Sequence, residues 1–273
     1  MKLEGKSQQG FEHDCKFNGD CFVAGTLVHT DKGLVPIEQL KVGDMVLSKH
    51  ESGEGEQAYK RVMKMFKSEE KRPIYRVKYT TYTILESLNN SDSTKITKFI
   101  FCTEQHPFLI VDKSWVSALN LETGNEILLS NNEKGIVIDE TLPIYETALK
   151  DVGYSYNQCA KDPLCDIPCL MVDFRSGVPQ LLGGEGINCY SDWNYWHESE
   201  NILELSDKTD DPAVIVFKNA FYDMPTLDQY TATVYNLEVE DFHTYYVGNA
   251  GIWVHNASSV ALNDCVSKHT LKQ

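Results

Sequence analysis

Residues 234–256 read VYNLEVEDFHTYYVGNAGIWVHN, and this stretch decides the fold class. It consists of short runs rich in Val, Ile, Tyr and Trp, with polar and glycine residues between them. Such runs favour short β-strands joined by turns. The pattern ends abruptly at Asn256, after which the chain becomes polar and irregular.

The same texture fills the first half of the chain. Short β-rich runs, broken by Gly, Pro and Asp, occupy residues 21–30 (CFVAGTLVHT), 33–40 (GLVPIEQL) and 44–50 (DMVLSKH). Residues 74–86 and 97–102 flank a turn-rich segment, which predicts two strands of a hairpin. No segment here has the length and 3.6-residue period of a substantial helix. The sequence therefore predicts an all-β fold of many short strands.

An internal repeat supports this prediction. Residues 31–47 (DKGLVPIEQLKVGDMVL) align without a gap on residues 112–128 (DKSWVSALNLETGNEIL), at a constant offset of 81 (112 against 31). The identical pairs are Asp31/Asp112, Lys32/Lys113, Val35/Val116, Leu40/Leu121, Gly43/Gly124 and Leu47/Leu128. Two copies are too few for a solenoid. They indicate two similar β subunits related by a pseudo-twofold axis.

Composition excludes several classes of partner. The 273 residues contain 25 Lys and Arg against 40 Asp and Glu, a formal net charge of −15. Nucleic-acid binding needs a basic face, so no nucleic-acid partner is expected. No uncharged apolar run approaches the roughly 18 residues of a membrane span, so no membrane partner is expected. We expect a monomer.

Changes in texture divide the chain into five predicted segments. Residues between Glu140 and Tyr230 form an acidic insertion, with sixteen acidic and five basic residues. The predicted segments are an N-terminal flank (1–20), the first part of the folded domain (21–139), the insertion (140–230), the last part of the domain (231–256) and a C-terminal flank (257–273).

The insertion contains four of the eight cysteines, Cys159, Cys165, Cys169 and Cys189. Four thiolates suffice for a structural zinc site, although these spacings match no standard zinc ribbon or finger. Disulfides and unpaired thiols stay open as alternatives. We expect no cofactor elsewhere in the chain.

Chemically suggestive residues fall into three clusters that are far apart in sequence. The clusters are Gly19-Asp20-Cys21, Thr103-Glu104-Gln105-His106, and His243 with Val254-His255-Asn256-Ala257. With the runs around them, they resemble the sequence blocks of the Hint superfamily, which comprises inteins, bacterial intein-like domains and the Hint modules of polymorphic toxins. The resemblance implies a flattened, pseudo-twofold β horseshoe whose two ends meet at one site. It also implies that the chain cleaves itself, so its partners are its own flanking segments.

The resemblance assigns the N-terminal chemistry to Cys21. Its thiolate attacks the carbonyl carbon of Asp20 and converts the peptide bond into a thioester, an N-to-S acyl shift. His106 can protonate the departing Cys21 nitrogen. Thr103 can hydrogen-bond the scissile amide or the oxyanion.

The resemblance assigns the C-terminal chemistry to Asn256. Its carboxamide attacks its own carbonyl carbon, forms a succinimide and breaks the bond to Ala257. His255 can polarise that carbonyl or protonate the leaving nitrogen, and His243 can deprotonate or orient the carboxamide. Both attacks are intramolecular, so correct placement alone supplies roughly 7–11 kcal/mol.

Two residues depart from a splicing pattern. Splicing inteins carry Cys, Ser or Thr directly after the terminal Asn, and this chain carries Ala257. Cleavage is therefore the expected main outcome, with inefficient ligation. The Asp20 carboxylate could attack its own acyl carbon and favour N-terminal release, which is a further hypothesis.

Two alternative functions follow from the same residues. A degenerate Hint domain would act as a non-catalytic binding or structural module, but all the main catalytic positions are intact. A Hedgehog-type sterol-transferring module fits poorly, because the His255-Asn256 end is retained. The short acidic insertion lacks a homing-endonuclease motif and would repel DNA, so nuclease activity is excluded.

Overall fold

The computed structural model describes residues 20–81, 98–112, 114–147, 149–156, 168–183, 202–204 and 228–256. Helical structure in these ranges is confined to two single 3-10 turns, η1 (Ile37–Gln39) and η2 (Ala118–Asn120). The strands are β1 (Phe22–Val23), β2 (Leu27–Thr30), β3 (Gly33–Pro36), β4 (Met45–Ser48), β5 (Ala58–Lys67), β6 (Arg72–Pro73), β7 (Tyr75–Thr81), β8 (Lys98–Cys102), β9 (Pro107–Leu109), β10 (Trp115–Ser117), β11 (Glu126–Leu128), β12 (Lys134–Val137), β13 (Leu142–Pro143), β14 (Tyr145–Glu146), β15 (Val152–Tyr156), β16 (Pro168–Asp173), β17 (Gln180–Gly183), β18 (Ile202–Glu204), β19 (Thr231–Ala232), β20 (Val234–Val239), β21 (Thr244–Val247) and β22 (Ile252–His255). The all-β prediction is confirmed. Within these ranges, no helix has the length and apolar character needed to cross a membrane.

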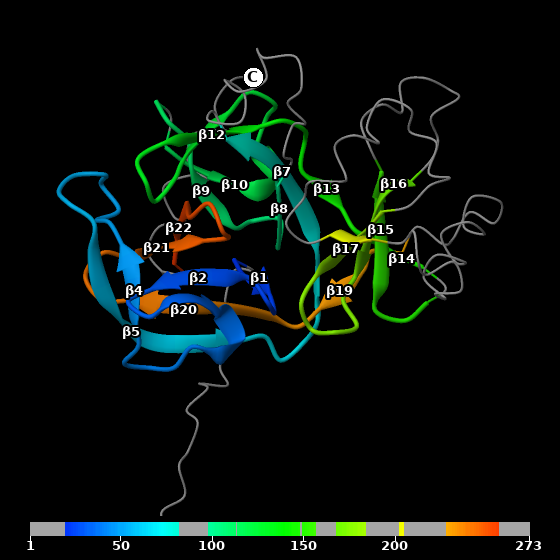
Figure 1. Cartoon of the computed structure of the whole chain (residues 1–273), viewed down its shortest axis with the longest axis horizontal. Helices are drawn as coiled ribbons and strands as arrows, with labels where there is room; N and C mark the ends of the chain where they lie inside the picture. Colours follow the sequence, from blue (N-terminus) through cyan, green and yellow to red (C-terminus); the bar gives the residue numbers. More distant parts are fainter. Residues whose placement is uncertain are drawn as a thin grey trace, which may run out of the picture.

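Fifteen strands form one strongly curved antiparallel sheet (Figure 1). Its order is β10-β9-β22-β21-β2-β4-β5-β20-β1-β8-β7-β12-β11, with β3 beside β2 and β13 beside β7. The two ends of this path approach each other, because isolated bridges join Ile110 to Ile127 and Leu129 to Ile252. The sheet therefore bends into the predicted horseshoe. The predicted pairing of β7 with β8 is also present.

The internal repeat is visible in the backbone. The turns η1 and η2 lie at equivalent places in the two copies, and each precedes a glycine with positive φ, +98° at Gly43 and +89° at Gly124. Such φ values favour glycine, because it lacks a Cβ atom. The next side chain in each copy, Asp44 or Asn125, accepts the N–H three residues before it, at 2.9 and 3.2 Å. The two copies thus share one local structure, which supports the pseudo-twofold prediction.

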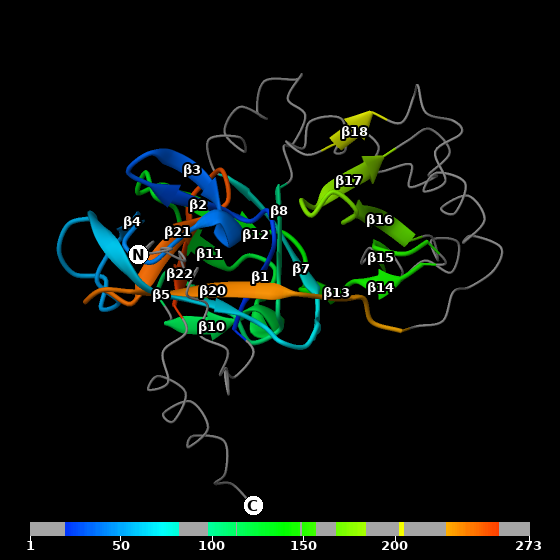
Figure 2. The ribbon, with the colours of Figure 1, turned by 90° about the horizontal axis from the view of Figure 1, so that it is seen from below.

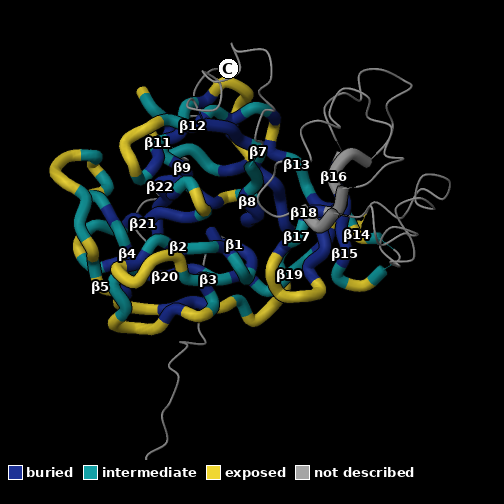
Figure 3. The backbone as a smooth tube through the Cα atoms, in the orientation of Figure 1, coloured by how far each residue is buried: buried dark blue, intermediate teal, exposed yellow. Residues whose placement is uncertain are grey.

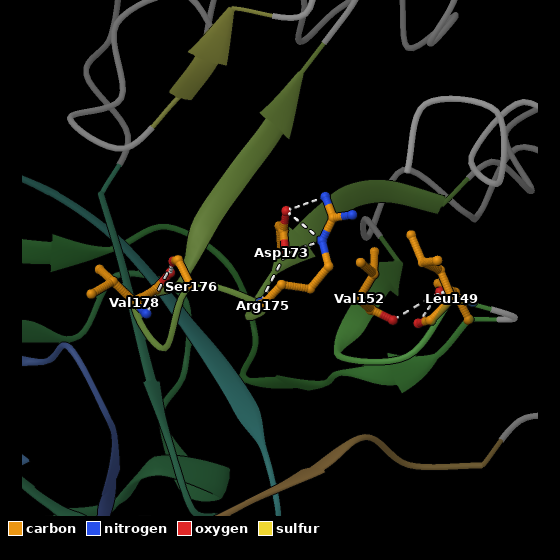
Figure 4. Close-up of polar contacts among 7 residues, drawn as sticks. Leu149, Val152, Asp173, Arg175, Ser176 and Val178 are labelled. Carbon is orange, nitrogen blue, oxygen red and sulfur yellow. Dashed lines mark hydrogen bonds and ion pairs between the residues drawn. The ribbon is translucent and has the colours of Figure 1, made fainter. Parts of the chain in front are cut away.

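A second sheet, in the order β14-β15-β16-β17-β18, lies beside β7 and β13 (Figure 2). Its strands fall within the predicted insertion. Phe174 stacks on Tyr230 with ring centroids 4.5 Å apart and meets Phe101 of β8 edge-on at 5.8 Å. A turn between β16 and β17 is tied by Arg175 to Asp173, with the closest atoms 2.5 Å apart (Figure 4). These aromatic contacts attach the second sheet to the horseshoe.

Strands from the beginning and the end of the folded domain are buried (Figure 3). Every residue of β21 and β22 is buried, and so are both residues of β1. Apolar side chains from opposite ends of the sequence, such as Phe22 and Val254, belong to one core cluster. The fold therefore brings the start of β1 and the end of β22 into the protein interior.

Candidate functional site

The Asp20–Cys21 peptide bond lies inside the fold. Strand β1 is paired on both sides, with Phe22 opposite Tyr235 of β20 and opposite Cys102 of β8. Asp20 and Cys21 are only 6% and 7% exposed. The Asp20–Cys21 peptide bond is therefore shielded from solvent, at the start of a strand that is paired on both sides.

Both ends of this peptide group are hydrogen-bonded. The Cys21 N–H donates to Oγ1 of Thr103 at 2.9 Å. The carboxamide N–H of Asn236 donates to the carbonyl oxygen of Asp20. The Asn236 carboxamide is itself oriented, because its oxygen accepts the hydroxyl of Tyr245 at 2.8 Å. The site thus holds an acceptor at the scissile nitrogen and a fixed donor at the scissile oxygen.

Asn236 is a functional candidate that the sequence analysis missed. It is completely buried in β20, at a position whose neighbours on the strand are mostly apolar. Buried amides almost always have hydrogen-bond partners. A lone amide in a buried strand was a usable signal, but the sequence did not indicate which group it would contact.

His106 is fully buried. Its ring centroid is 3.9 Å from that of Phe22, and neither ring nitrogen has a hydrogen-bond partner within the described residues. Burial, and to a lesser extent the nearby His255, lower the pKa of His106 from 6.5 to about 3, while the backbone of Asp20 acts in the opposite direction. At neutral pH the imidazole is therefore uncharged, and its low pKa makes it a weak base.

The C-terminal candidates lie on the β21–β22 hairpin, where Thr244 pairs with His255. Nδ1 of His255 is 2.7 Å from the carbonyl oxygen of Asn256, the carbonyl that cyclisation would attack. The Asn256 backbone N–H donates to the carbonyl of His243 at 2.9 Å. Asn256 is 1% exposed, so its side chain is fixed by the protein.

The Asn256 carboxamide also contacts backbone groups. In the orientation that satisfies both of its ends, its nitrogen donates to the His243 carbonyl at 3.0 Å and its oxygen accepts the N–H of Val239 at 3.1 Å. His243 adopts a left-handed backbone conformation, with φ of +57°. The His243 carbonyl oxygen accepts both the backbone N–H and the carboxamide N–H of Asn256. The buried Nδ1 of His243 has no hydrogen-bond partner in the part of the chain described. The predicted role of the His243 imidazole stays a prediction.

The described residues at the two proposed cleavage junctions lie in one region of the fold. His106 directly precedes β9, and Phe108 of β9 pairs with Val254 of β22. The His106 ring contacts Phe22 of β1, and His255 contributes to the lowered pKa of His106. The fold therefore brings Cys21, Thr103 and His106 together with His255 and Asn256, although 235 positions (256 against 21) separate the ends.

The carboxyl group of Asp20 is the other unusual feature of the site. Burial raises its pKa from 3.8 to about 7. Its Oδ1 has no hydrogen-bond partner within the described ranges. Nearby, Cys102 is buried, and burial followed by the charge of Asp20 raises the pKa of its thiol. The surroundings of the scissile bond thus strongly disfavour negative charge.

Several predicted residues lie beyond what the structure describes. Ala257 and Cys159, Cys165 and Cys189 are outside the described residues, and for Cys169 of β16 only the backbone is described. The zinc, disulfide and unpaired-thiol alternatives therefore stay open. Among the residues described, no group of three or more His, Cys, Asp or Glu side chains is arranged to hold a metal.

Comparison with known proteins identifies a family that the sequence matches. The family model of the pretoxin Hint domain matches residues 27–157 and 209–257, which is more than half of the chain. No curated protein matches the sequence.

Three solved structures to which the chain is similar are remote from it in sequence. A bacterial intein-like domain from Clostridium thermocellum is 21% identical (TM-score 0.45), and the match covers 87% of this chain and 99% of that domain. A DnaB intein from Synechocystis sp. is 11% identical (TM-score 0.43), with the same coverages of 87% and 99%. A DnaX mini intein from Spirulina platensis is 14% identical (TM-score 0.37), with coverages of 87% and 100%.

Proposed function

Because the chain belongs to the pretoxin Hint domain family, we propose that it cleaves its own backbone at Asp20–Cys21 and at Asn256–Ala257. A capacity for self-processing in general follows from the family and its fold. The observation that carries the specific proposal is that each scissile carbonyl has its own positioned polar partner, Asn236 at Asp20 and His255 at Asn256. Mass spectrometry of the products tests it.

The proposed domain organisation follows from this chemistry. Residues 21–139 and 231–256 would form the self-processing domain, and residues 140–230 an insertion whose second sheet packs on it. Residues 1–20 and 257–273 would be the released flanks. Domains of this kind sit within longer polypeptides, so the substrate is the chain itself and each molecule reacts once.

In the N-terminal step, neutral His106 would take the proton of the Cys21 thiol as the sulfur attacks and would hold it only transiently, because burial lowers the pKa of His106 to about 3. The thiolate attacks the Asp20 carbonyl carbon, and the Asn236 carboxamide stabilises the resulting oxyanion. The carbon–nitrogen bond then breaks, and the imidazolium of His106 returns the proton to the Cys21 nitrogen. The product is a thioester and a free amine, with no net change in atoms.

Thioester breakdown would release residues 1–20. Water can attack the thioester carbonyl and regenerate the Cys21 thiol. The Asp20 carboxylate can also attack its own acyl carbon, which expels the thiolate and forms a five-membered anhydride that water then opens. With a pKa of about 7, a substantial fraction of this carboxyl is ionised at neutral pH.

The C-terminal step uses the Asn256 carboxamide nitrogen, which is oriented by the His243 carbonyl. This nitrogen attacks the Asn256 carbonyl carbon, while the N–H of His255 Nδ1 stabilises the oxyanion. A succinimide forms, the bond to Ala257 breaks, and one carboxamide proton moves to the Ala257 nitrogen. Ala257 has no thiol or hydroxyl to capture the thioester, so cleavage should dominate over ligation.

Asn236→Ala should slow thioester formation about 10²–10³-fold, because it removes the donor to the developing oxyanion. The rate can be measured as hydroxylamine-dependent release of residues 1–20 in an Asn256→Ala background. Tyr245→Phe should cause a smaller loss, because Asn236 keeps its donor and loses only one orienting bond. A variant that is folded by circular dichroism but reacts at the parental rate would exclude this role for Asn236.

Asp20→Asn should make stability less dependent on pH. The ordinary pKa of Asp is 3.8 and the folded-state pKa is about 7, so between these values the unfolded chain ionises first. Stability of the parent therefore falls as pH rises from about 4 to 7 and levels off above 7. The difference should reach on the order of 4 kcal/mol. Urea unfolding of a Cys21→Ala/Asn256→Ala parent, with and without Asp20→Asn, measures it, and parallel pH curves would contradict the assignment.

A further inference from the structure

Glu51 contacts His255, which takes part in the proposed C-terminal reaction. It lies in the loop between β4 and β5, 204 positions from His255 along the chain. Its Oε2 is 2.8 Å from Nε2 of His255. The other ring nitrogen, Nδ1, is 2.7 Å from the Asn256 carbonyl oxygen. The imidazole of His255 thus bridges a carboxylate and a scissile carbonyl.

Both contacts of the ring are with oxygen acceptors. A neutral imidazole carries a hydrogen on only one nitrogen, so its other nitrogen would direct a lone pair at an oxygen. Only the imidazolium donates through both nitrogens at once. A carboxylate at hydrogen-bond distance stabilises that form and strengthens the bond.

We infer that Glu51 is a positioning residue, which holds His255 with both nitrogens protonated so that Nδ1–H is aimed at the Asn256 carbonyl. This inference rests on the proposed function and adds to it the group that activates the histidine. A charged donor should polarise the carbonyl more strongly than a neutral one and should better stabilise the oxyanion.

The surroundings of His255 fit this arrangement. Trp115 meets the ring edge-on at 5.0 Å and restricts its rotation. The His255 side chain is 4% exposed, whereas that of Glu51 is 42% exposed, so Glu51 lies between the buried ring and solvent. His106 is affected by His255 and is uncharged at neutral pH, because its pKa is about 3. A charged His255 therefore meets no repulsion from an imidazolium at His106.

The test compares Glu51 with a carboxylate of the same loop. In a Cys21→Ala background, Glu51→Gln should slow scission at Asn256–Ala257 about 10²-fold, the lower end of what positioned acid–base groups contribute. Glu51→Asp keeps the charge and should recover part of this rate. Glu54→Gln makes the same charge change at an exposed position and should leave the rate unchanged. In an Asn256→Ala background, thioester formation at Cys21 should be the same in all these variants.

A second measurement does not depend on cleavage. In a Cys21→Ala/Asn256→Ala chain labelled with 15N-histidine, both ring nitrogens of His255 should carry a hydrogen, and Glu51→Gln should remove one of them. His255→Gln assigns the signals. If the wild type cleaves and Glu51→Gln reacts as fast as Glu54→Gln, the inference is overturned. If the wild type never cleaves at Asn256–Ala257, the proposed function fails there, and the ring signals alone decide the role of Glu51.

Discussion

Cys21→Ala is expected to abolish thioester formation and with it the release of residues 1–20. In the proposed reaction the sulfur of Cys21 is the nucleophile that converts the Asp20 peptide bond into a thioester, and its placement in the same chain is worth roughly 7–11 kcal/mol over an external thiol. The measurement is the mass of the chain after hydroxylamine treatment, which cuts a thioester and leaves a peptide bond intact. Scission at Asn256–Ala257 should continue.

Cys102→Ala is the matched control for this prediction. Cys102 is also a buried cysteine, and it pairs with Phe22, one residue beyond Cys21. Burial raises the pKa of Cys102, which keeps this thiol protonated. Cys102→Ala should still form the thioester. If Cys102→Ala abolished thioester formation and Cys21→Ala did not, the nucleophile would be Cys102 and not Cys21.

Asn256→Ala is expected to abolish scission of the bond to residue 257. Alanine lacks the carboxamide that closes the five-membered succinimide. The loss should span several orders of magnitude, since an intramolecular attack is replaced by hydrolysis of an ordinary amide. Separation of the products by mass, with succinimide or Asn at the new C-terminus, measures it.

Asn131→Ala controls for the general loss of an asparagine side chain. Asn131 is exposed in the turn after β11, where its carboxamide oxygen accepts the N–H of Glu133 at 3.0 Å. This variant should cleave at both junctions like the wild type. Release of residues 257–273 from Asn256→Ala at the wild-type rate would show that another group breaks this bond.

The sequence was most informative where a residue's role depends on local pattern. Alternating runs and turn residues indicated the all-β class, and the offset repeat indicated two similar subunits, which the positions of η1 and η2 bear out. Thr103 and His106 could be selected because they match the Thr-x-x-His block of the Hint superfamily, and the structure places them just after β8 and just before β9. Local periodicity and spacing are preserved in folding, so such predictions carry over to the structure.

Contacts across the fold could not be predicted in the same way. Asn236 is brought to Asp20 by the pairing of β20 with β1, and Glu51 is brought to His255 from a loop that has no pattern of its own. The low pKa of His106 depends on complete burial, which a single sequence does not fix. The contact of Asn256 with the backbone of His243 follows from the turn between β20 and β21.

The central claim is that both ends of the domain cut their own junctions, and the intact mass of the purified wild-type chain over time tests it most directly. The starting mass should decay into a fragment ending at Asp20, a fragment starting at Ala257 and the middle domain. A single mass that stays unchanged while the chain is folded would contradict it, and would indicate a Hint domain that has become a non-catalytic module.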